Sequence, residues 1–461
     1  MMPRTFHTPG PRLREFDPST PVEEVNRMQK YMRWSGLLVV LMLVLAACAA
    51  DTGGSASPGA STPASSDEAE DATAVCEADA KGCVEVAAGD PLKIASALAI
   101  TGDVAFLGND TNYGVEIAIA DRGGEVLGHE IELVKEDAGC SDAATGQTAA
   151  QAIVADPQIA AVIGTTCSRT AVPAMPVLDE AGLVMISPSN TAPSLTNPDS
   201  EDFGGPFFFR TAYNDNVQGA AVALFACEEL GVTTAATIHD GSPYAEQLQQ
   251  VFVDQFAELC DGTTTAQEAI NVGEVQFTDV LETIAADAPE LLFFPIFDPE
   301  GPLITQQAQD VAGLENTILM GADGVKDQGF LDTAGDIAEE VGMYFSGPDL
   351  NFGGAYESDF LPAYIELSGE DGPIAPYHAH GYDAANIIFD AIEAVAVADA
   401  DGNLFIPKDA LREYIAGLTD YDGLTGTLTC DEFGDCGAED VSVAQVVDGE
   451  FSEVWTTRDL Q

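Results

Sequence analysis

The sequence predicts an α/β fold of two doubly wound α/β lobes joined by a three-crossover hinge, with a cleft between the lobes. Two observations lead to this prediction. From Pro91 onward, apolar runs typical of buried strands alternate with segments of helical period, as in repeated β-α-β units. The same alternation begins again at Asn214, which indicates a second lobe of the same class.

In the first lobe, the segment 111–124 has helical period and stops at a pair of glycines. Ser141 or Asp142 is expected to cap a helix over 141–156. Strands are predicted at 91–100, 128–139, 158–164 and 183–187, and 204–211 leads toward the first crossover.

The second lobe is predicted from the same alternation. Its helices are expected at 216–230, 242–260 and 299–314, and its strands at 233–240, 263–270, 289–297, 317–324 and 339–347. Two later helices, 356–369 and 377–398, are long enough to pack on the first lobe, and hairpins at 423–437 and 442–457 return toward the second. We therefore assign 76–212 plus 347–439 to the N-terminal lobe and 213–346 plus 440–461 to the C-terminal lobe.

The N-terminal region is typical of an exported lipoprotein. A twelve-residue apolar run, Gly36–Ala47, follows three basic residues, which fits a secretory signal and is short for a membrane span. The sequence LAAC at 45–48 resembles a bacterial lipobox, which implies cleavage before Cys48 and lipid attachment to its sulfur. Residues 1–47 are then a signal peptide with an N-terminal extension, and 48–75 a lipidated disordered linker. The alternative is an uncleaved helix that anchors the chain in the membrane.

The charge balance excludes one class of partner. The chain has 16 Lys and Arg against 77 Asp and Glu, for a formal charge of −61. Such a surface repels polyanions, so no nucleic-acid partner is expected. The apolar content of 46% still indicates a folded chain, and the acidity favours an adaptation for solubility.

Nine cysteines are present, and assigning Cys48 to the lipid leaves eight for disulfides in an exported protein. Spacing alone does not select among their connectivities. Local loops and neighbouring helix ends favour the pairs Cys76–Cys83, Cys140–Cys167, Cys227–Cys260 and Cys430–Cys436. The rival interpretation is a metal site, but no CxxC or HxxxH spacing occurs, so no metal and no cofactor are expected.

Two small-polar loops follow consecutive apolar runs. GTTCSRT follows AAVIG, and SPSNTAP follows GLVMI, so both loops should lie at the carboxyl ends of parallel strands, where open α/β sheets bind ligands. The first loop also opens a helix. Its free backbone N–H groups and the hydroxyls of Ser168 and Thr170 are expected to form a cradle for a carboxylate or a phosphate.

An enzyme on this fold would need a nucleophile with a base, or a metal. The sequence contains no GxSxG, HExxH or P-loop motif, and neither Cys167 nor Ser168 has a histidine nearby in sequence. We therefore predict a binding protein without a reaction of its own.

Short motifs follow one another in a characteristic order along the chain: DAGC at 137–140, IGTTCS at 163–168, GLVMISPSNTAP at 182–193, FFRT at 208–211, HDGSPYA at 239–245, FDPE at 297–300 and MGADG at 320–324. In the order and spacing of these motifs, the chain from Pro91 to about Thr457 resembles the type I periplasmic binding proteins of branched-chain amino acid ABC transporters.

The resemblance implies a set of ligand contacts. Ser168 and Thr191 match the residues that bind the ligand's α-carboxylate, and Ser189 matches a position of backbone contact. Tyr244 and Phe297 match aromatic residues of the second lobe, although Phe297 lacks the hydroxyl usual there. Asp323 matches an acidic residue, often Glu, that pairs with the α-ammonium. Leu107 replaces an aromatic residue near the ligand's side chain.

Each of these residues also has a purely structural interpretation. Ser168 is suited to capping a helix and Thr191 to ordering a turn. Tyr244 and Phe297 are equally compatible with the wall of a cleft or a core. Asp323 is one acid among many, and Arg169, inside the cradle loop, is suited either to a ligand contact or to a surface salt bridge.

The resemblance implies a membrane-tethered, extracytoplasmic component of an ABC importer. It is expected to be a monomer that binds a branched-chain or other aliphatic amino acid and delivers it to permease subunits in the cell membrane. The alternatives are binding of short amides or urea for transport, and a sensory ectodomain.

Overall fold

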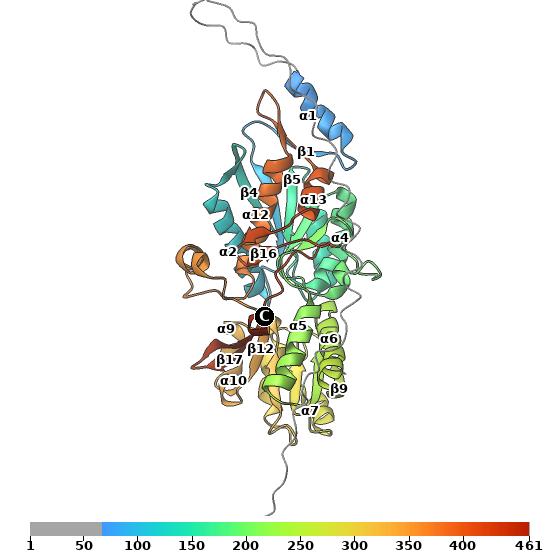
Figure 1. The fold of residues 1–461 in the computed structure, drawn as a ribbon, viewed down its shortest axis with the longest axis vertical. Coiled ribbons are helices and arrows are strands. Elements are labelled where there is room, and N and C mark those ends of the chain that lie inside the picture. Colours follow the sequence, from blue (N-terminus) through green and yellow to red (C-terminus); the bar gives the residue numbers. More distant parts are fainter. Residues whose placement is uncertain (1–66, 461) are drawn as a thin grey trace, which may run out of the picture. The chain divides into compact units, whose positions relative to one another are not determined.

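The computed structural model describes residues 67–460, which form two α/β lobes with separate sheets (Figure 1). The first-lobe sheet has the strand order β3-β4-β2-β5-β6-β7, and all its pairs are parallel except β3 with β4. Its strands are β2 (Leu92–Leu98), β3 (Glu125–Val126), β4 (His129–Asp137), β5 (Ile159–Gly164), β6 (Val184–Ser187) and β7 (Phe208–Arg210). The order reverses direction at β2 and β5.

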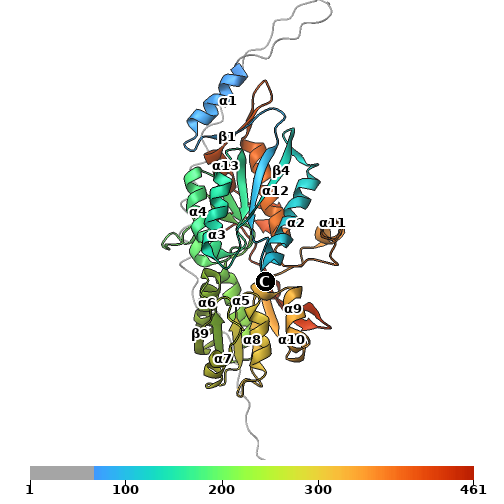
Figure 2. The ribbon, with the colours of Figure 1, turned by 180° about the vertical axis from the view of Figure 1, so that it is seen from behind.

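Helices cover both faces of this sheet, as Figure 2 shows from behind. One face packs against buried residues of α2, α12 and α13, and the other against α3 and α4. These helices are α2 (Ala105–Asp121), α3 (Ala143–Val154), α4 (Ser168–Ala181), α12 (His378–Val395) and α13 (Lys408–Ala416). Asp142 caps α3 by accepting a hydrogen bond from the Ala144 backbone N–H at 3.0 Å, as one of the two predicted alternatives.

The second-lobe sheet has the order β18-β17-β12-β11-β10-β8-β9, with parallel pairing from β12 to β9 and antiparallel pairing at β17 and β18. The direction reverses between β8 and β10. Its strands are β8 (Thr234–His239), β9 (Thr263–Ala269), β10 (Leu291–Phe294), β11 (Ile318–Gly321), β12 (Tyr344–Pro348), β17 (Val441–Val447) and β18 (Glu450–Thr456). Its helices are α5 (Asp215–Leu224), η2 (Phe225–Glu229), α6 (Pro243–Cys260), α7 (Thr278–Ala285), α8 (Glu300–Ala308), η3 (Asp323–Val325), α9 (Gln328–Ala334) and α10 (Ile337–Glu340).

Three segments connect the two sheets and lie beside one another. The first follows β7, the second follows β12, and the third precedes β17. Arg210 exchanges backbone hydrogen bonds with Gly434 and Cys436 at 3.0 Å each, and the Asp349 N–H donates to the Asp440 carbonyl at 3.1 Å. These bonds join the third segment to the other two. The fold is therefore the predicted pair of doubly wound lobes.

The folded chain begins earlier than predicted. The linker was expected to extend to Val75, but helix α1 (Asp67–Ala78) already starts at Asp67. A disulfide from Cys76 to Cys83 joins α1 to strand β1 (Cys83–Val86), which pairs with β14 (Leu404–Pro407) in a small sheet completed by β13 (Val397–Ala398). Local composition alone indicates a tether. It carries no sign of this sheet, because β1 pairs with a strand more than 300 residues away in sequence.

Two late segments also differ from the prediction. The helix expected over 377–398 ends at Val395, because the backbone of Ala396 is extended and the next two residues pair with β14. The hairpin expected over 423–437 consists instead of β15 (Tyr421–Gly423) and β16 (Gly426–Leu428). The rest of that segment is a loop, and Leu428 and Cys436 pack in the core of the first lobe.

The remaining elements are short and were mostly not predicted. Helix α11 (Leu361–Ser368) continues the turn η4 (Tyr356–Phe360), and together they fill the helix expected at 356–369. The turns η1 (Pro193–Thr196) and η5 (Thr457–Leu460) complete the structure. The prediction missed α7, α9, α10, α13, β1, β3, β13 and β14, whose short lengths give little local signal.

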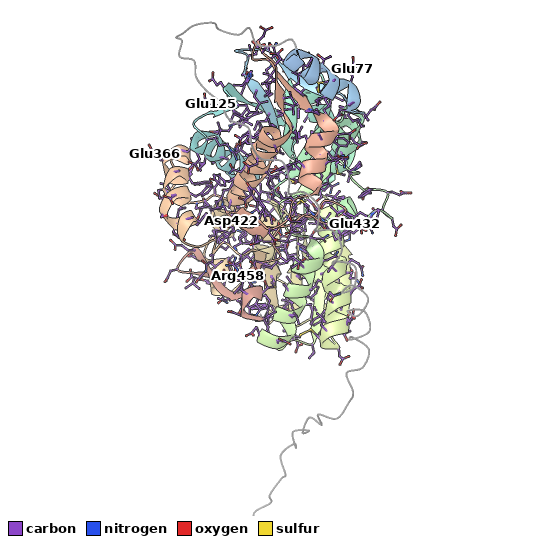
Figure 3. All side chains as sticks on the ribbon, turned by 45° about the horizontal axis from the view of Figure 1, so that its top comes forward. Glu77, Glu125, Glu366, Asp422, Glu432 and Arg458 are labelled. Carbon is purple, nitrogen blue, oxygen red and sulfur yellow. A yellow bond between two sulfur atoms is a disulfide. The ribbon has the colours of Figure 1, made fainter. Side chains whose placement is uncertain are left out.

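The four disulfides join the predicted pairs: Cys76–Cys83, Cys140–Cys167, Cys227–Cys260 and Cys430–Cys436. Acidic side chains such as Glu77, Glu125, Glu366 and Glu432 are exposed (Figure 3). Between residues 67 and 460, no helix has both the length and the apolar character needed to cross a membrane. The predicted signal peptide and Cys48 lie outside the described residues.

Candidate functional site

A small cavity lies where the strands of both sheets end. The empty space in and around it, open solvent included, is about 250 Å³, and it is lined by Leu107, Thr166, Cys167, Ser168, Ser189, Tyr244, Phe297, Asp323 and Tyr377. Leu107 and Ser168 follow β2 and β5, where the first sheet reverses direction, and Tyr244 and Phe297 follow β8 and β10, where the second does. Such reversal points are the usual ligand sites of open α/β sheets.

Ser168 is the first residue of α4, and it faces the cavity. Its hydroxyl oxygen accepts a long hydrogen bond, 3.4 Å, from the Ala192 backbone N–H, and it does not cap the helix. The first-turn N–H groups and the dipole of this 14-residue helix favour an anion at this end. Ser168 therefore lacks the capping role of the structural interpretation, and its side chain lines the cavity.

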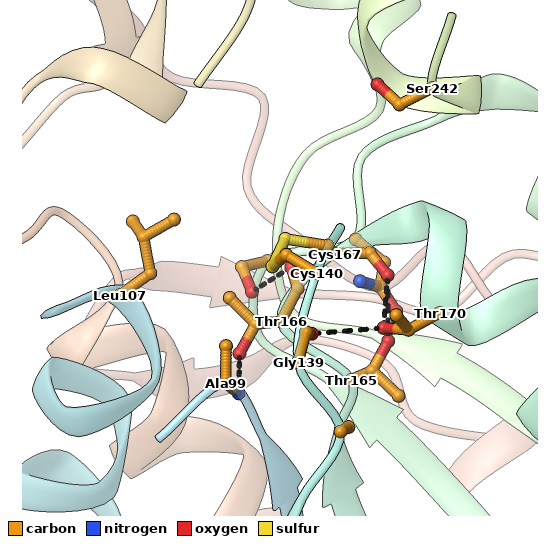
Figure 4. The surroundings of a disulfide bond; sticks show 12 residues. Ala99, Leu107, Gly139, Cys140, Thr165, Thr166, Cys167, Thr170 and Ser242 are labelled. Atoms are coloured by element: carbon orange, nitrogen blue, oxygen red, sulfur yellow. Dashed lines mark hydrogen bonds between the residues drawn. A yellow bond between two sulfur atoms is a disulfide. The ribbon is translucent and has the colours of Figure 1, made fainter. Parts of the chain in front are cut away.

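Thr170 does not contribute to the cradle, contrary to the prediction. Its hydroxyl donates to the Cys167 carbonyl at 3.0 Å within the first turn of α4 and lies 3.5 Å from the Gly139 carbonyl (Figure 4). Residues two apart on a helix point to different sides, so Ser168 and Thr170 cannot both face one ligand. The disulfide between Cys140 and Cys167 instead connects the cradle to the preceding β-α loop.

Arg210 holds the SPSNTAP loop, residues 187–193, in place. Its side chain is completely buried, and one guanidinium nitrogen donates to the carbonyls of Asn190 and Ala192 at 3.0 Å each. The same side chain forms an ion pair with Asp435, in the loop closed by the fourth disulfide. Arg210 thus fixes the backbone on both sides of Thr191.

Thr191, like Thr170, is a predicted ligand residue that does not line the cavity. It is fully buried, and its carbonyl accepts a hydrogen bond from the Asp215 N–H at 3.0 Å. Burial, followed by the charge of the neighbouring Asp323, raises the pKa of the Asp215 carboxyl well above its usual range. The Thr191 hydroxyl lies beside this carboxyl and lowers its pKa to a smaller extent.

Asp323 lies in the cavity wall at the end of β11 and is only 4% exposed. One carboxylate oxygen accepts hydrogen bonds from Gln218 Nε2 and the Tyr244 hydroxyl, both at 2.9 Å. The other accepts one from the Tyr377 hydroxyl at 2.7 Å. The pKa of Asp323 is raised, because the effect of burial exceeds the lowering by these three hydrogen bonds. The three donors favour the carboxylate form and oppose this rise, and the solvated-acid interpretation does not apply to a side chain so deeply buried.

The aromatic residues form the second-lobe side of the cavity. The Tyr244 and Phe297 rings are tilted by 43°, with centroids 5.1 Å apart. Gly324 permits this arrangement, because a Cβ there would lie 2.7 Å from the Ile296 carbonyl oxygen and 3.0 Å from the Phe297 ring. Leu107, from α2, provides an apolar surface on the first-lobe side.

Three residues of the site were not singled out from the sequence. Thr166 lines the cavity, and its hydroxyl accepts a hydrogen bond from the Ala99 N–H at 2.9 Å. Gln218 and Tyr377 both donate to Asp323. Thr166 belongs to the GTTCSRT loop, whose position after an apolar run already indicates the carboxyl end of a strand. Gln218 and Tyr377 belong to helical segments whose pattern says only which face is buried.

Arg169 contacts the other lobe and does not line the cavity. Its guanidinium donates to the Asp240 carbonyl at 3.3 Å and lies 3.9 Å from the Asp240 carboxylate. Asp103 of the first lobe also interacts electrostatically with Asp298 and Glu300 of the second. Burial, then the Asp327, Glu300 and Asp103 carboxylates, raise the pKa of Asp298 to about 8.

Comparisons with known proteins agree with the two-lobed fold. The periplasmic binding protein family matches residues 91–450. The chain is 30% identical over 362 residues to the leucine-, isoleucine-, valine-, threonine- and alanine-binding protein of Pseudomonas aeruginosa, covering 77% of this chain and 90% of that protein.

Solved structures show the same fold. A leucine binding protein from Thermotoga maritima superposes with a TM-score of 0.70 at 26% identity, covering 79% of this chain and 98% of that one. A solute binding protein from R. palustris, in complex with benzoate, has a TM-score of 0.67 at 19% identity, covering 79% of this chain and 96% of that one. The chain therefore belongs to the periplasmic binding protein family and has its two-lobed type I fold.

Proposed function

We propose that this protein is the solute-binding component of an ABC importer and that it binds an aliphatic amino acid between its lobes. One observation carries the choice of ligand. Among the residues that line the cavity, Asp323 is the only charged one, and the opposite wall offers hydroxyls and the start of α4. The cavity thus combines an anion with a neutral anion cradle.

A zwitterion matches this arrangement. The ligand's ammonium group would pair with Asp323, while its carboxylate would meet the hydroxyl of Ser168, the loop at Ser189 and the N-terminus of α4. Thr191, held in the same loop, would complete the carboxylate site by a small rearrangement. The aliphatic side chain would lie between Leu107 and Phe297. Leucine, isoleucine and valine have both charges and an apolar side chain.

The other ligand classes fit less well. Urea or a short amide would leave the buried Asp323 carboxylate without a counter-charge, which is costly. An aromatic acid such as benzoate would add a second negative charge without bringing a cation. The role of a sensory ectodomain would use the same ligand and differ only in the membrane partner. The proposed role is binding and delivery by a monomer, with no reaction.

A thermal-shift panel tests the ligand class. We expect leucine, isoleucine and valine to raise the melting temperature, since a ligand at a hundredfold excess over its Kd adds about 2.7 kcal/mol of stability. Urea, leucinamide and benzoate should give much smaller shifts at equal concentration. A larger shift with benzoate or urea than with any amino acid would refute the proposed ligand class.

We also propose that the protein is tethered to the extracytoplasmic face of the cell membrane through lipidated Cys48. The support is the order of basic residues, apolar run and LAAC in the sequence. Globomycin treatment, or Cys48→Ala, is expected to block maturation, which a shift in electrophoretic mobility and loss of membrane association would report. Processing that is identical with and without the cysteine would contradict the tether.

A further inference from the structure

We propose that Ser194 and Gln247 form an interlobe latch that sets the affinity for the ligand without contacting it. This proposal rests on the proposed function, because it assumes that the lobes separate to admit a ligand and close around it. The Ser194 backbone N–H donates to Gln247 Oε1 at 2.8 Å, and Gln247 Nε2 donates to the Ser194 hydroxyl oxygen at 2.8 Å. Neither residue lines the cavity.

The latch joins the two segments that supply the ligand site. Ser194 lies in η1, three residues after Thr191, and Gln247 lies in α6, three residues after Tyr244. A movement that separates the lobes would therefore break the latch and withdraw Tyr244 from the first-lobe loops together. Ser194 is 9% exposed and Gln247 is half-buried, so water competes only partly for these hydrogen bonds.

The other contacts between the lobes act differently. The Tyr377 bond to Asp323 lies inside the cavity and is part of the ligand site. The ion pair of Arg169 with Asp240 is long, at 3.9 Å, and the Arg169 side chain is 24% exposed, so solvent screens it. Asp103 on the first lobe repels Asp298 and Glu300 on the second. The reciprocal pair of Ser194 and Gln247 offsets this repulsion in the closed arrangement.

The effect on binding follows from linkage. If ligands bind the closed state, the apparent Kd rises as the closed fraction falls, by the same factor for every ligand. Loss of two hydrogen bonds with ordinary net strengths corresponds to about 5- to 150-fold. A latch residue therefore changes affinity and leaves specificity unchanged, whereas a residue that touches the ligand changes both.

The affinity test compares Gln247→Leu with Gln250→Leu. Gln250 is exposed on the same helix and bonds only to Asp254 within it, so it is a matched control. By calorimetry, Gln247→Leu should weaken leucine and valine binding about tenfold or more. The ratio of the two affinities and the ligand-free melting temperature should stay unchanged, and Gln250→Leu should match the wild type.

Adding Ser194→Ala to Gln247→Leu should cause no further loss of affinity. A change below twofold, unequal losses for the two amino acids, or a further loss in the double variant would overturn the latch.

Crosslinking tests the contact without any ligand. Ser194→Cys with Gln247→Cys should form a disulfide under mild oxidation faster than Ser194→Cys with Gln250→Cys, as followed by non-reducing peptide mapping. Equal rates would overturn the latch. If the wild-type protein bound no amino acid, the proposed function would fail alone, because the crosslinking rates would still decide whether the two residues meet.

Discussion

Asp323→Asn is expected to weaken leucine binding by about 2–5 kcal/mol, the range for removing one partner of a buried, hydrogen-bonded charge pair. The asparagine keeps the shape of the side chain, and its single amide oxygen can still accept the hydrogen bonds from Gln218 and Tyr244, which share one carboxylate oxygen of Asp323. It removes the only charge that lines the cavity. The ligand's ammonium group would then be desolvated without a counter-charge. Calorimetry on the wild type and the variant measures the loss.

Asp332→Asn is the matched control. Asp332 is an exposed acid on α9 that accepts a hydrogen bond from Gln328, so its charge is screened by solvent. We expect no change in leucine binding for this variant. If Asp323→Asn costs less than about 0.5 kcal/mol, the size of a screened surface interaction, the ligand has no ammonium group at this position. An amide or urea would then become the better candidate.

Removing the disulfide between Cys140 and Cys167 by changing both residues to alanine is expected to lower the free energy of unfolding by about 3–4 kcal/mol. This value follows from the chain entropy of the loop, whose ends are 27 residues apart in sequence. Urea denaturation of the two proteins would measure it. Leucine affinity should fall as well, because Cys167 lines the cavity and immediately precedes Ser168.

The disulfide between Cys227 and Cys260 provides the control for this variant. It closes a loop of similar size, with a separation of 33 residues, and lies in the second lobe away from the cavity. Changing both of these residues to alanine should destabilise the protein to a similar extent and leave leucine affinity unchanged. Equal losses of affinity in the two double variants would show that the Cys140–Cys167 bond has no specific role in the cradle.

Much of the first-lobe site could be predicted because its signals are local. An apolar run followed by small polar residues marks the carboxyl end of a parallel strand, and this pattern located Ser168 and the loop that contains Ser189. The resemblance to known binding proteins added Tyr244, Phe297 and Asp323, and these three residues line the same cavity as the first two. It also pointed to Thr191, which the structure places in the correct loop but behind the cavity surface.

Local sequence does not determine side-chain direction or long-range partners. Thr170 carries the same kind of hydroxyl as Ser168, yet a shift of two residues along α4 turns it toward the Cys167 carbonyl. Two of the three donors to Asp323 are Gln218 and Tyr377, which are 105 and 54 residues away in sequence. The sequence around each of these residues indicates a helix and nothing more. A hydrogen bond between residues so far apart in sequence produces no periodic pattern from which it could be predicted.

The sequence by itself determined the alternation of strands and helices, the repeat of that alternation in a second lobe, and the loops at the strand ends. These features depend on interactions between near neighbours, such as burial of one helix face and satisfaction of backbone hydrogen bonds. Only the tertiary structure decided that α1 belongs to the folded chain, that Asp323 has three donors, and that Ser194 meets Gln247. Each of these depends on packing between distant segments, whose geometry is fixed only when both sheets and their crossing segments are in place.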